Sequence, residues 1–390
     1  MDPGLNPYTP NAGAKPPALV GRDQEMDAFD VLLARLQRGR AEQSLLVTGL
    51  RGVGKTVLLG AFQDRAQLAG WISVDTEITR ATRFGGRMAH LTKRALLEIA
   101  PATRWKERAR RAARILQSFS LTVTTDGSVT GSLDLEPLTG KADSGDLGED
   151  LTDLLVGLGE AAAEHERGVV FLLDEIQFLD EPAFEALIAA IHKTVQRQLP
   201  ITLVGAGLPQ LPRLAGEAKS YAERLFRFPR IGRLDDVAAA AALVTPAREL
   251  GVEFDPRAVQ AVLAYTEGYP YFVQEYGRAL WDRADPPTIG AVEAVEAQAV
   301  VEAKLDADFF STRLERASDA EVTYMRALSR LGSEPQRAGA VADEMQRPVE
   351  RIATTRARLI DKGLVYAPKR GLTAFTVPQF DRYLRRTFPD

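Results

Sequence analysis

The sequence predicts an α/β fold in which helices cover both faces of a parallel sheet. Short apolar runs at residues 71–74, 169–173 and 201–204 alternate with helical stretches, which is typical of buried parallel strands. The run Ser44–Thr48 ends in a glycine-rich turn that leads into a helical pattern over residues 55–69. We therefore expect a strand, a loop and a helix at the start of an α/β domain.

The first 233 residues divide into an arm and this α/β core. Residues 1–16 are rich in Pro, Gly and Asn without periodicity, which predicts a flexible arm. Residues 17–233 form the expected core. Within it, residues 104–150 break the alternation, because a basic helix is followed by a hairpin signal at Asp126 and Gly127. We expect this segment to be an insertion.

The rest of the chain is helical before it ends in a hairpin. Residues 234–316 are alanine-rich and interrupted by Pro and Gly, which predicts a helical lid and connector. Residues 317–390 predict three helices and then two short strands, the arrangement of a winged helix-turn-helix. The expected helices are 319–331, 337–345 and 349–362, and the expected strands are 364–366 and 373–377.

Composition excludes several classes of function. The 390 residues contain no cysteine and only three histidines, none of them at a metal-ligand spacing, which excludes a disulfide scaffold and a thiolate or paired-histidine zinc site. No apolar run approaches about 18 residues, and the first residues lack the pattern of a signal peptide. We therefore expect a cytoplasmic protein without a membrane partner.

A phosphate-binding loop is the clearest chemical signal. Residues 49–56 read GLRGVGKT and match GxxxxGK[ST] between a strand and a helix. Three loop glycines allow backbone N–H groups to turn towards phosphate oxygens, and the helix N-terminus adds partial positive charge. Lys55 is expected to contact the β- and γ-phosphates of ATP, and the Thr56 hydroxyl to ligate Mg²⁺. The other expected nucleotide contacts here are Gly49, Leu50, Arg51, Gly52, Val53, Gly54 and Val57.

Two acidic residues follow a second buried strand. Residues 169–175 read VVFLLDE. An enzyme with this loop needs a carboxylate at the end of a neighbouring strand to hold the magnesium shell, and often a base to orient water. We expect Asp174 in the first role and Glu175 in the second. The pair predicts Mg²⁺-dependent hydrolysis of ATP rather than binding alone.

These motifs resemble those of the AAA-type and STAND-type P-loop ATPases, especially the origin-recognition-like and archaeal ATPase branches. Matching features span about residues 18–390. The resemblance implies that the segment LVGRDQEMDAF packs on the adenine, which would place Val20, Gly21 and Arg22 beside the base.

The same resemblance assigns further positions. In TEGYPYFVQEYG, Gly268 and Pro270 fall where related proteins contact the nucleotide, whereas typical AAA proteins place an arginine there. Arg224 lies where the family keeps an arginine that completes its own site or that of a neighbouring subunit, which implies a nucleotide-dependent homo-oligomer in the second case. Residues 201–207 match the sensor strand but lack the usual polar residue at its end. The absence of the usual arginine at Gly268–Pro270 favours a switch over a processive motor.

One helix of the expected winged domain has a basic face. Between residues 349 and 362, apolar side chains share one side at about 100° per residue, namely Val349, Ile352, Ala353, Leu359 and Ile360. Arg356 falls among them, which predicts a structural ion pair. The opposite side presents Arg351, Thr355 and Arg358 to DNA, and the wing turn adds Lys369 and Arg370. Residues 317–390 hold 13 Arg or Lys against 9 Asp or Glu, although the whole chain has a net charge of −4.

The expected function is therefore an ATP-driven molecular switch that couples nucleotide state to DNA binding. Two alternatives stay open. One is a signalling or conflict-system ATPase whose winged helix binds a protein partner. The other is a phosphotransferase acting on a small acceptor, which would consume ATP only when that acceptor is present.

Overall fold

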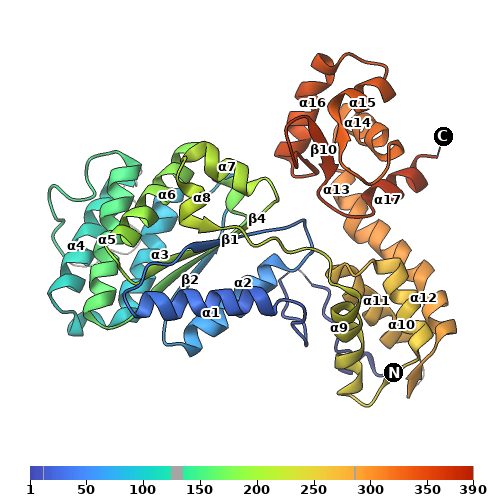
Figure 1. Ribbon diagram of the computed structural model, residues 1–390, viewed down its shortest axis with the longest axis horizontal. Helices are drawn as coiled ribbons and strands as arrows, with labels where there is room; N and C mark the ends of the chain where they lie inside the picture. Colours follow the sequence, from blue (N-terminus) through green and yellow to red (C-terminus); the bar gives the residue numbers. More distant parts are fainter. Residues whose placement is uncertain (12, 124–134, 285–286, 390) are drawn as a thin grey trace.

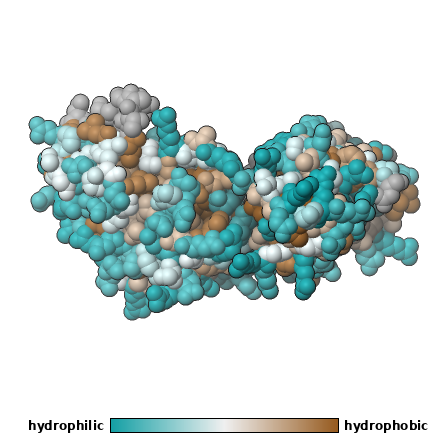
Figure 2. Space-filling view, turned by 90° about the horizontal axis from the view of Figure 1, so that it is seen from above, coloured by the Kyte–Doolittle hydropathy of each residue, from teal (hydrophilic) through white to brown (hydrophobic). Residues whose placement is uncertain are grey.

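Three parts follow one another along the chain in the computed structural model, which describes residues 1–11, 13–123, 135–284 and 287–389. Figure 1 shows an α/β core, a helical lid in yellow and orange, and a C-terminal domain in red above the lid. Seen from above, the molecule has two lobes with a notch between them (Figure 2). None of the helices described is long and apolar enough to cross a membrane.

The core is built on a five-stranded sheet in which every pairing is parallel. The strand order is β2-β3-β4-β1-β5. The strands are β1 (Ser44–Thr48), β2 (Ile72–Glu77), β3 (Val169–Asp174), β4 (Ile201–Gly207) and β5 (Phe226–Arg227). The predicted α/β fold with a parallel sheet is confirmed.

Successive side chains of the central strands enter two different hydrophobic clusters. In β1, Leu45 and Val47 belong to one cluster, whereas Leu46 belongs to the other. In β3, Leu172 and Phe171 divide in the same way. Because neighbouring side chains of a strand point to opposite faces, this division requires apolar cover on both sides. It explains why these strands appear in the sequence as continuous apolar runs.

Helices supply that cover. One face carries α1 (Asp23–Gln37) and α2 (Lys55–Leu68), and Figure 1 shows the remaining helices of the core on the other side. These are α3 (Phe84–Ile99), α4 (Glu107–Val123), α5 (Leu147–Glu164), α6 (Glu181–Gln196), α7 (Leu211–Ala218) and α8 (Ala222–Leu225). Short 3₁₀ turns occur at Pro3–Leu5, Ala102–Arg104 and Ile176–Phe178.

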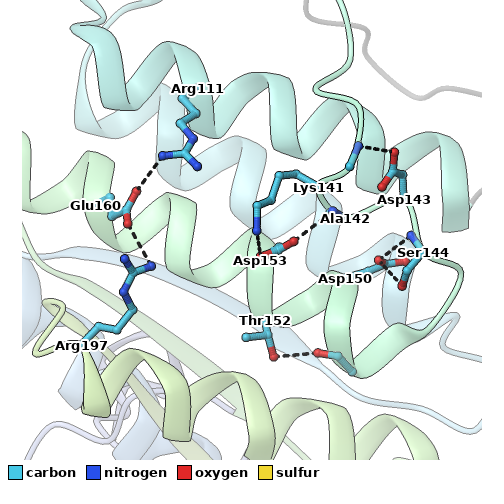
Figure 3. Close-up of polar contacts among 12 residues, drawn as sticks. Arg111, Lys141, Ala142, Asp143, Ser144, Asp150, Thr152, Asp153, Glu160 and Arg197 are labelled. Carbon is cyan, nitrogen blue, oxygen red and sulfur yellow. Dashed lines mark hydrogen bonds and ion pairs between the residues drawn. The ribbon is translucent and has the colours of Figure 1, made fainter.

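The expected insertion extends this helical layer. Its basic helix is α4, which packs on α3 and α5. The hairpin expected at Asp126 and Gly127 lies outside the described residues. The loop before α5 is fixed by the buried Asp150 carboxylate, which accepts hydrogen bonds from the N–H and hydroxyl of Ser144 at 2.9 and 2.8 Å (Figure 3). It also accepts from the N–H of Gly145 at 3.1 Å.

The lid is helical, as the sequence predicts, and also contains one short parallel strand pair. Its helices are α9 (Asp236–Arg248), α10 (Pro256–Thr266), α11 (Pro270–Arg283) and α12 (Ala291–Lys304), and its strands are β6 (Glu253–Phe254) and β7 (Thr288–Ile289). A connector follows, formed by the π-helical segment Leu305–Ser311 and α13 (Thr312–Leu314).

The C-terminal domain contains the three predicted helices and a small antiparallel sheet of order β8-β10-β9. The helices are α14 (Asp319–Arg330), α15 (Ala338–Glu344) and α16 (Val349–Asp361), and the strands are β8 (Gln336–Arg337), β9 (Val365–Tyr366) and β10 (Leu372–Phe375). Strand β8 and the final helix α17 (Phe380–Thr387) were not predicted.

The apolar face of α16 is narrower than predicted. Ile352 and Leu359 are buried, but Ala353 is exposed and Val349 is 41% exposed. Val349 is the first residue of the helix, where the cover by neighbouring elements ends. The expected ion pair of Arg356 is also wrong, because its guanidinium donates to Thr373 Oγ1 and Leu372 O in β10 at 2.6 and 2.8 Å.

The N-terminal arm is docked on the lid, so the prediction of a flexible segment is wrong. Tyr8 is 3% exposed, and its hydroxyl donates to the carbonyl of Leu243 at 2.5 Å. Its ring lies over Gly277, where an added Cβ would come within 2.5 Å of the ring. The Met1 ammonium donates to Ala284 O at 2.9 Å. Pro, Gly and Asn disfavour helices and strands, but they do not prevent an extended chain from packing through one aromatic side chain.

We predict that Tyr8→Ala releases this arm. Removing a buried aromatic side chain typically costs about 3 kcal/mol or more, which exceeds what the remaining polar contacts of the arm contribute. Hydrogen exchange should become fast in residues 1–11 and in the covered face of α11, with the core unchanged. Leu5→Ala is the control, because Leu5 is 61% exposed. Equal protection in wild type and Tyr8→Ala would contradict the anchoring role.

Candidate nucleotide site

The loop between β1 and α2 has the backbone shape expected of a phosphate cradle. Gly52 and Gly54 have φ values of +80° and +92°, which residues with a Cβ rarely adopt. Gly49 serves a different purpose, because an added Cβ would lie 2.6 Å from the carbonyl oxygen of Ile231. Gly54 caps α2 without a side-chain hydrogen bond, so the first N–H groups of the helix are available to an anion.

Lys55 is held inside this loop. Its side chain is buried, and its ammonium donates to the carbonyl oxygens of Gly49 at 3.1 Å and Leu50 at 2.8 Å. Burial lowers the pKa of Lys55, and the nearby carboxylates of Glu175 and Asp174 oppose this decrease. The loop therefore positions one cation at its centre.

Asp174 ends β3 directly opposite the start of α2. The Thr56 hydroxyl donates to Asp174 Oδ2 at 2.5 Å, so the two predicted magnesium ligands are adjacent. Burial raises the pKa of Asp174, whereas its hydrogen bonds from Thr56 and from the Glu175 N–H lower it. Two oxygen donors of this kind are suited to a hard divalent cation.

Glu175 has a strained backbone and a fixed side chain. Its φ of +52° is uncommon for a residue with a side chain, and such conformations cluster at functional sites. Its carboxylate accepts a hydrogen bond from Gln177 Nε2. Gln177 Oε1 in turn accepts from the N–H of Leu208, 3.1 Å away, just after β4.

Gln177 thus occupies the place where the sequence lacks a polar residue at the end of β4. Gly207 makes room for it, because an added Cβ there would lie 2.6 Å from Gln177 Oε1. The sequence does not reveal this arrangement, since Gln177 follows β3 and reaches β4 only in the folded chain.

A cavity of about 440 Å³ opens beside the loop, between the N-terminal segment and the lid. The predicted contacts that line it are Val20, Arg22, Arg51, Gly52, Val53, Gly54, Lys55, Thr56, Val57, Glu175 and Pro270. Sequence reasoning missed other parts of its wall. These are Tyr271 and Gln274 of α11, Asp308, Phe309 and Arg313 of the connector, and several residues between Thr9 and Leu19. The sequence could have indicated Gln274, because this residue lies one helical turn after Pro270. No local sequence pattern distinguishes Arg313.

Some predicted contacts lie outside this cavity. Gly268 has a φ of +69° and packs against the carbonyl oxygen of Leu234, from which an added Cβ would be 2.3 Å away, so it shapes the segment that joins the core to the lid. Gly49 and Leu50 face a smaller cavity of about 190 Å³. Gly21 lines neither cavity and packs against Ala238 and Leu234.

Arg22 and Arg224 also differ from their expected roles. Arg22 lines the cavity, but its guanidinium donates to the carbonyls of Val53 at 3.1 Å and Gly232 at 2.8 Å, which connects the loop to the segment between β5 and α9. Arg224 is exposed, and its carbonyl accepts from Gln43 just before β1, at the end of that strand opposite the loop. A role for Arg224 in the site of its own chain is therefore wrong, and a role in a neighbouring subunit stays a prediction.

Two segments of the chain match known protein families. Residues 18–204 match a family described as the AAA ATPase domain, and residues 307–384 match a domain of unknown function, DUF8462. No curated protein matches the chain. Among solved structures, a Walker-type ATPase of Pyrococcus abyssi is similar with a TM-score of 0.54 and 17% identity, over 94% of this chain and 96% of that one. The Orc1 protein of Aeropyrum pernix in complex with DNA gives a TM-score of 0.47 and 16% identity, over 95% and 94%. Residues 18–204 are thus similar in sequence to AAA ATPase domains, and their parallel sheet and phosphate loop form the α/β fold of a P-loop ATPase.

Proposed function

We propose that this protein is an ATP-hydrolysing molecular switch in which the phosphate loop controls the position of the C-terminal domain. One contact carries the proposal: the backbone N–H of Arg51, inside the loop, donates to the carbonyl of Thr376 in the C-terminal domain at 3.1 Å. A change in the loop on phosphate binding or release would act directly on this hydrogen bond. The domain and the bound nucleotide would therefore influence each other reciprocally.

Each polar residue of the site has a role in this proposal. Lys55 contacts the β- and γ-phosphates, and Thr56 and Asp174 hold Mg²⁺, which would neutralise part of the phosphate charge. The described residues contain no cluster of three His, Cys, Asp or Glu side chains that could hold a metal alone, so phosphate and water oxygens would complete the magnesium shell. Glu175 accepts a proton from the water whose oxygen attacks the γ-phosphorus, while the bond to the β–γ bridging oxygen breaks.

The attachment of the C-terminal domain suits a switch, because its contacts with the connector and with the core differ in kind. Towards the connector it has an aromatic contact, in which Phe310 stacks on Tyr383 with ring centroids 5.2 Å apart and also contacts Phe380. An ion pair, between Arg386 and Asp306, lies beside these rings. Towards the core, Arg80 forms an exposed ion pair and hydrogen bond with Asp361. Exposed ion pairs contribute little, typically below about 1 kcal/mol. The contact with the core can therefore be broken at modest cost while the connector stays attached.

We further propose that the C-terminal domain is a winged helix that binds DNA. Arg351 and Arg358 are exposed on α16, Thr355 is half-buried between them, and Lys369 and Arg370 are exposed in the turn between β9 and β10. The helix and the turn thus present positively charged side chains that the packing of the domain does not need. Arg356, which fastens α16 to β10, would keep the two groups in a fixed relation.

The exposed Arg224 is consistent with a homo-oligomer that forms when nucleotide is bound. It lies on α8 beside β5, the outermost strand of the sheet. From there its guanidinium can reach a second molecule, where it would complete the charge on the terminal phosphate.

Lys55→Ala should weaken ATP binding at least about a hundredfold. The phosphate loop would lose its central cation, and charge-assisted hydrogen bonds of this kind contribute about 1.5–3 kcal/mol each. Binding of a fluorescent ATP analogue measures the effect. Lys193→Ala removes an equal charge from a position on α6 outside the site and should bind as wild type does. Wild-type affinity in Lys55→Ala would rule out this loop as the phosphate site.

Glu175→Gln should bind ATP normally but hydrolyse it at least about tenfold more slowly, because the variant can no longer accept the proton of the attacking water. Steady-state phosphate release gives the rate. Glu181→Gln, an exposed carboxylate in the first turn of α6, is the control and should not change turnover. Unchanged hydrolysis in Glu175→Gln would assign the base to another residue.

DNA affinity should depend on nucleotide and on the two basic groups in different ways. Arg351→Ala with Arg358→Ala should cost about 1–3 kcal/mol for each hydrogen bond to a base that the variant cannot form, whereas Lys369→Ala with Arg370→Ala should weaken all sequences alike and reduce the salt slope. Fluorescence anisotropy with ATP, with ADP and without nucleotide measures both effects.

The control for DNA binding is Arg257→Ala with Arg283→Ala, which removes the same charge from exposed positions of the lid. If neither C-terminal double variant differs from this control at several salt concentrations, the domain does not read DNA. The protein-partner alternative would then replace it.

A further inference from the structure

Two hydrogen-bond donors lie beside Gly52 without an acceptor. Arg51 Nε and the Tyr269 hydroxyl are buried, and within the described residues neither atom has a hydrogen-bond partner. The Tyr269 ring lies against the loop, since an added Cβ on Gly52 would be 3.2 Å from its hydroxyl oxygen. Unsatisfied buried donors destabilise a folded protein, so the presence of two at one place requires an explanation.

Arg313 adds a third donor, and it comes from the connector. Its guanidinium carbon is 3.9 Å from the centroid of the Phe309 ring, and the group also donates to Phe309 O. Arg313 lines the same cavity as Lys55 and Thr56. Burial, together with the neighbouring charge of Arg51, lowers the pKa of Arg313 to about 10.

No acidic side chain in the described part of the chain forms an ion pair with either arginine. The ion pairs found among the described residues include neither Arg51 nor Arg313. An arginine side chain can only donate hydrogen bonds, so neither arginine can accept a hydrogen bond from the other, and their charges repel. The chemical complement of such a pair is an anion with several acceptor oxygens, and planar guanidinium groups match phosphate in a bidentate manner.

We propose that Arg313 and Arg51, which both line this cavity, together bind the terminal phosphate of the nucleotide. The buried Tyr269 hydroxyl belongs to the wall of the smaller cavity and is not part of this assignment. This proposal rests on the proposed function, because it assigns a ligand to the same cavity. Since α13 leads into α14 of the C-terminal domain, the connector distinguishes ATP from ADP through Arg313. The presence of the γ-phosphate would hold the connector against the loop, and its loss would leave the two cations to repel.

The test compares ATP with ADP in Arg313→Gln. The variant should bind ATP at least about tenfold more weakly, while ADP affinity changes less than about threefold, so the ratio of the two affinities falls. Titration calorimetry with each nucleotide gives this ratio. Arg313→Lys keeps one charge over Phe309 and should recover part of the preference. Arg316→Gln removes a charge from an exposed position three residues later and should leave the ratio unchanged.

The possible results separate this inference from the proposed function. A wild type that binds neither nucleotide would overturn both. If the wild type prefers ATP and Arg313→Gln keeps that preference, only the role of Arg313 is wrong. An equal loss of ATP and ADP affinity, with normal recovery in Arg313→Lys, would move Arg313 away from the terminal phosphate and overturn the inference. An equal loss in both variants together with a lower unfolding temperature would assign it a structural role instead.

Discussion

The burial of one cation, Lys55, constrains the whole site. An ammonium group removed from water costs several kcal/mol unless charges and acceptors compensate it. Here the acceptors are carbonyls of its own loop, and the compensating charges are Asp174 and Glu175. Those carboxylates come from the end of β3, which is separated from β1 by β4. The strand order and the parallel direction of all three strands are therefore what allow the lysine to be buried.

Strand β4 contributes to the site through two glycines, which have no side chain. Gly205 and Gly207 leave space for Leu46 and Gln177, both of which would collide with an added Cβ at these positions. Gln177 fills this space and fixes the Glu175 carboxylate against the backbone of Leu208. Orientation of the proposed base thus depends on packing at the end of a neighbouring strand, and a larger residue there would disturb the site without touching any charged group.

The lid, the arm and the C-terminal domain share one hydrophobic cluster with a single face of the sheet. Aromatic rings link the lid, the connector and the C-terminal domain in series, because Phe272 contacts Phe310 and Phe310 contacts Phe380. Tyr8 of the arm belongs to the same cluster. By contrast, the C-terminal domain meets the core through Arg51, Arg80 and other polar groups. The C-terminal domain can rotate about its aromatic attachment to the connector, because its polar contacts with the core can be exchanged for hydrogen bonds to water.

The sequence by itself determined the α/β core, the phosphate loop and the Asp174–Glu175 pair, because each depends on local patterning: apolar runs, glycine spacing and the residues directly after a strand. It also indicated the helices of the lid and the C-terminal domain. Only the tertiary structure decided that the arm is docked by Tyr8, that Gln177 lies at the end of β4 and that Arg313 lines the nucleotide cavity. These three depend on contacts between residues distant in the chain, and composition or periodicity carries no information about which distant partner a side chain meets.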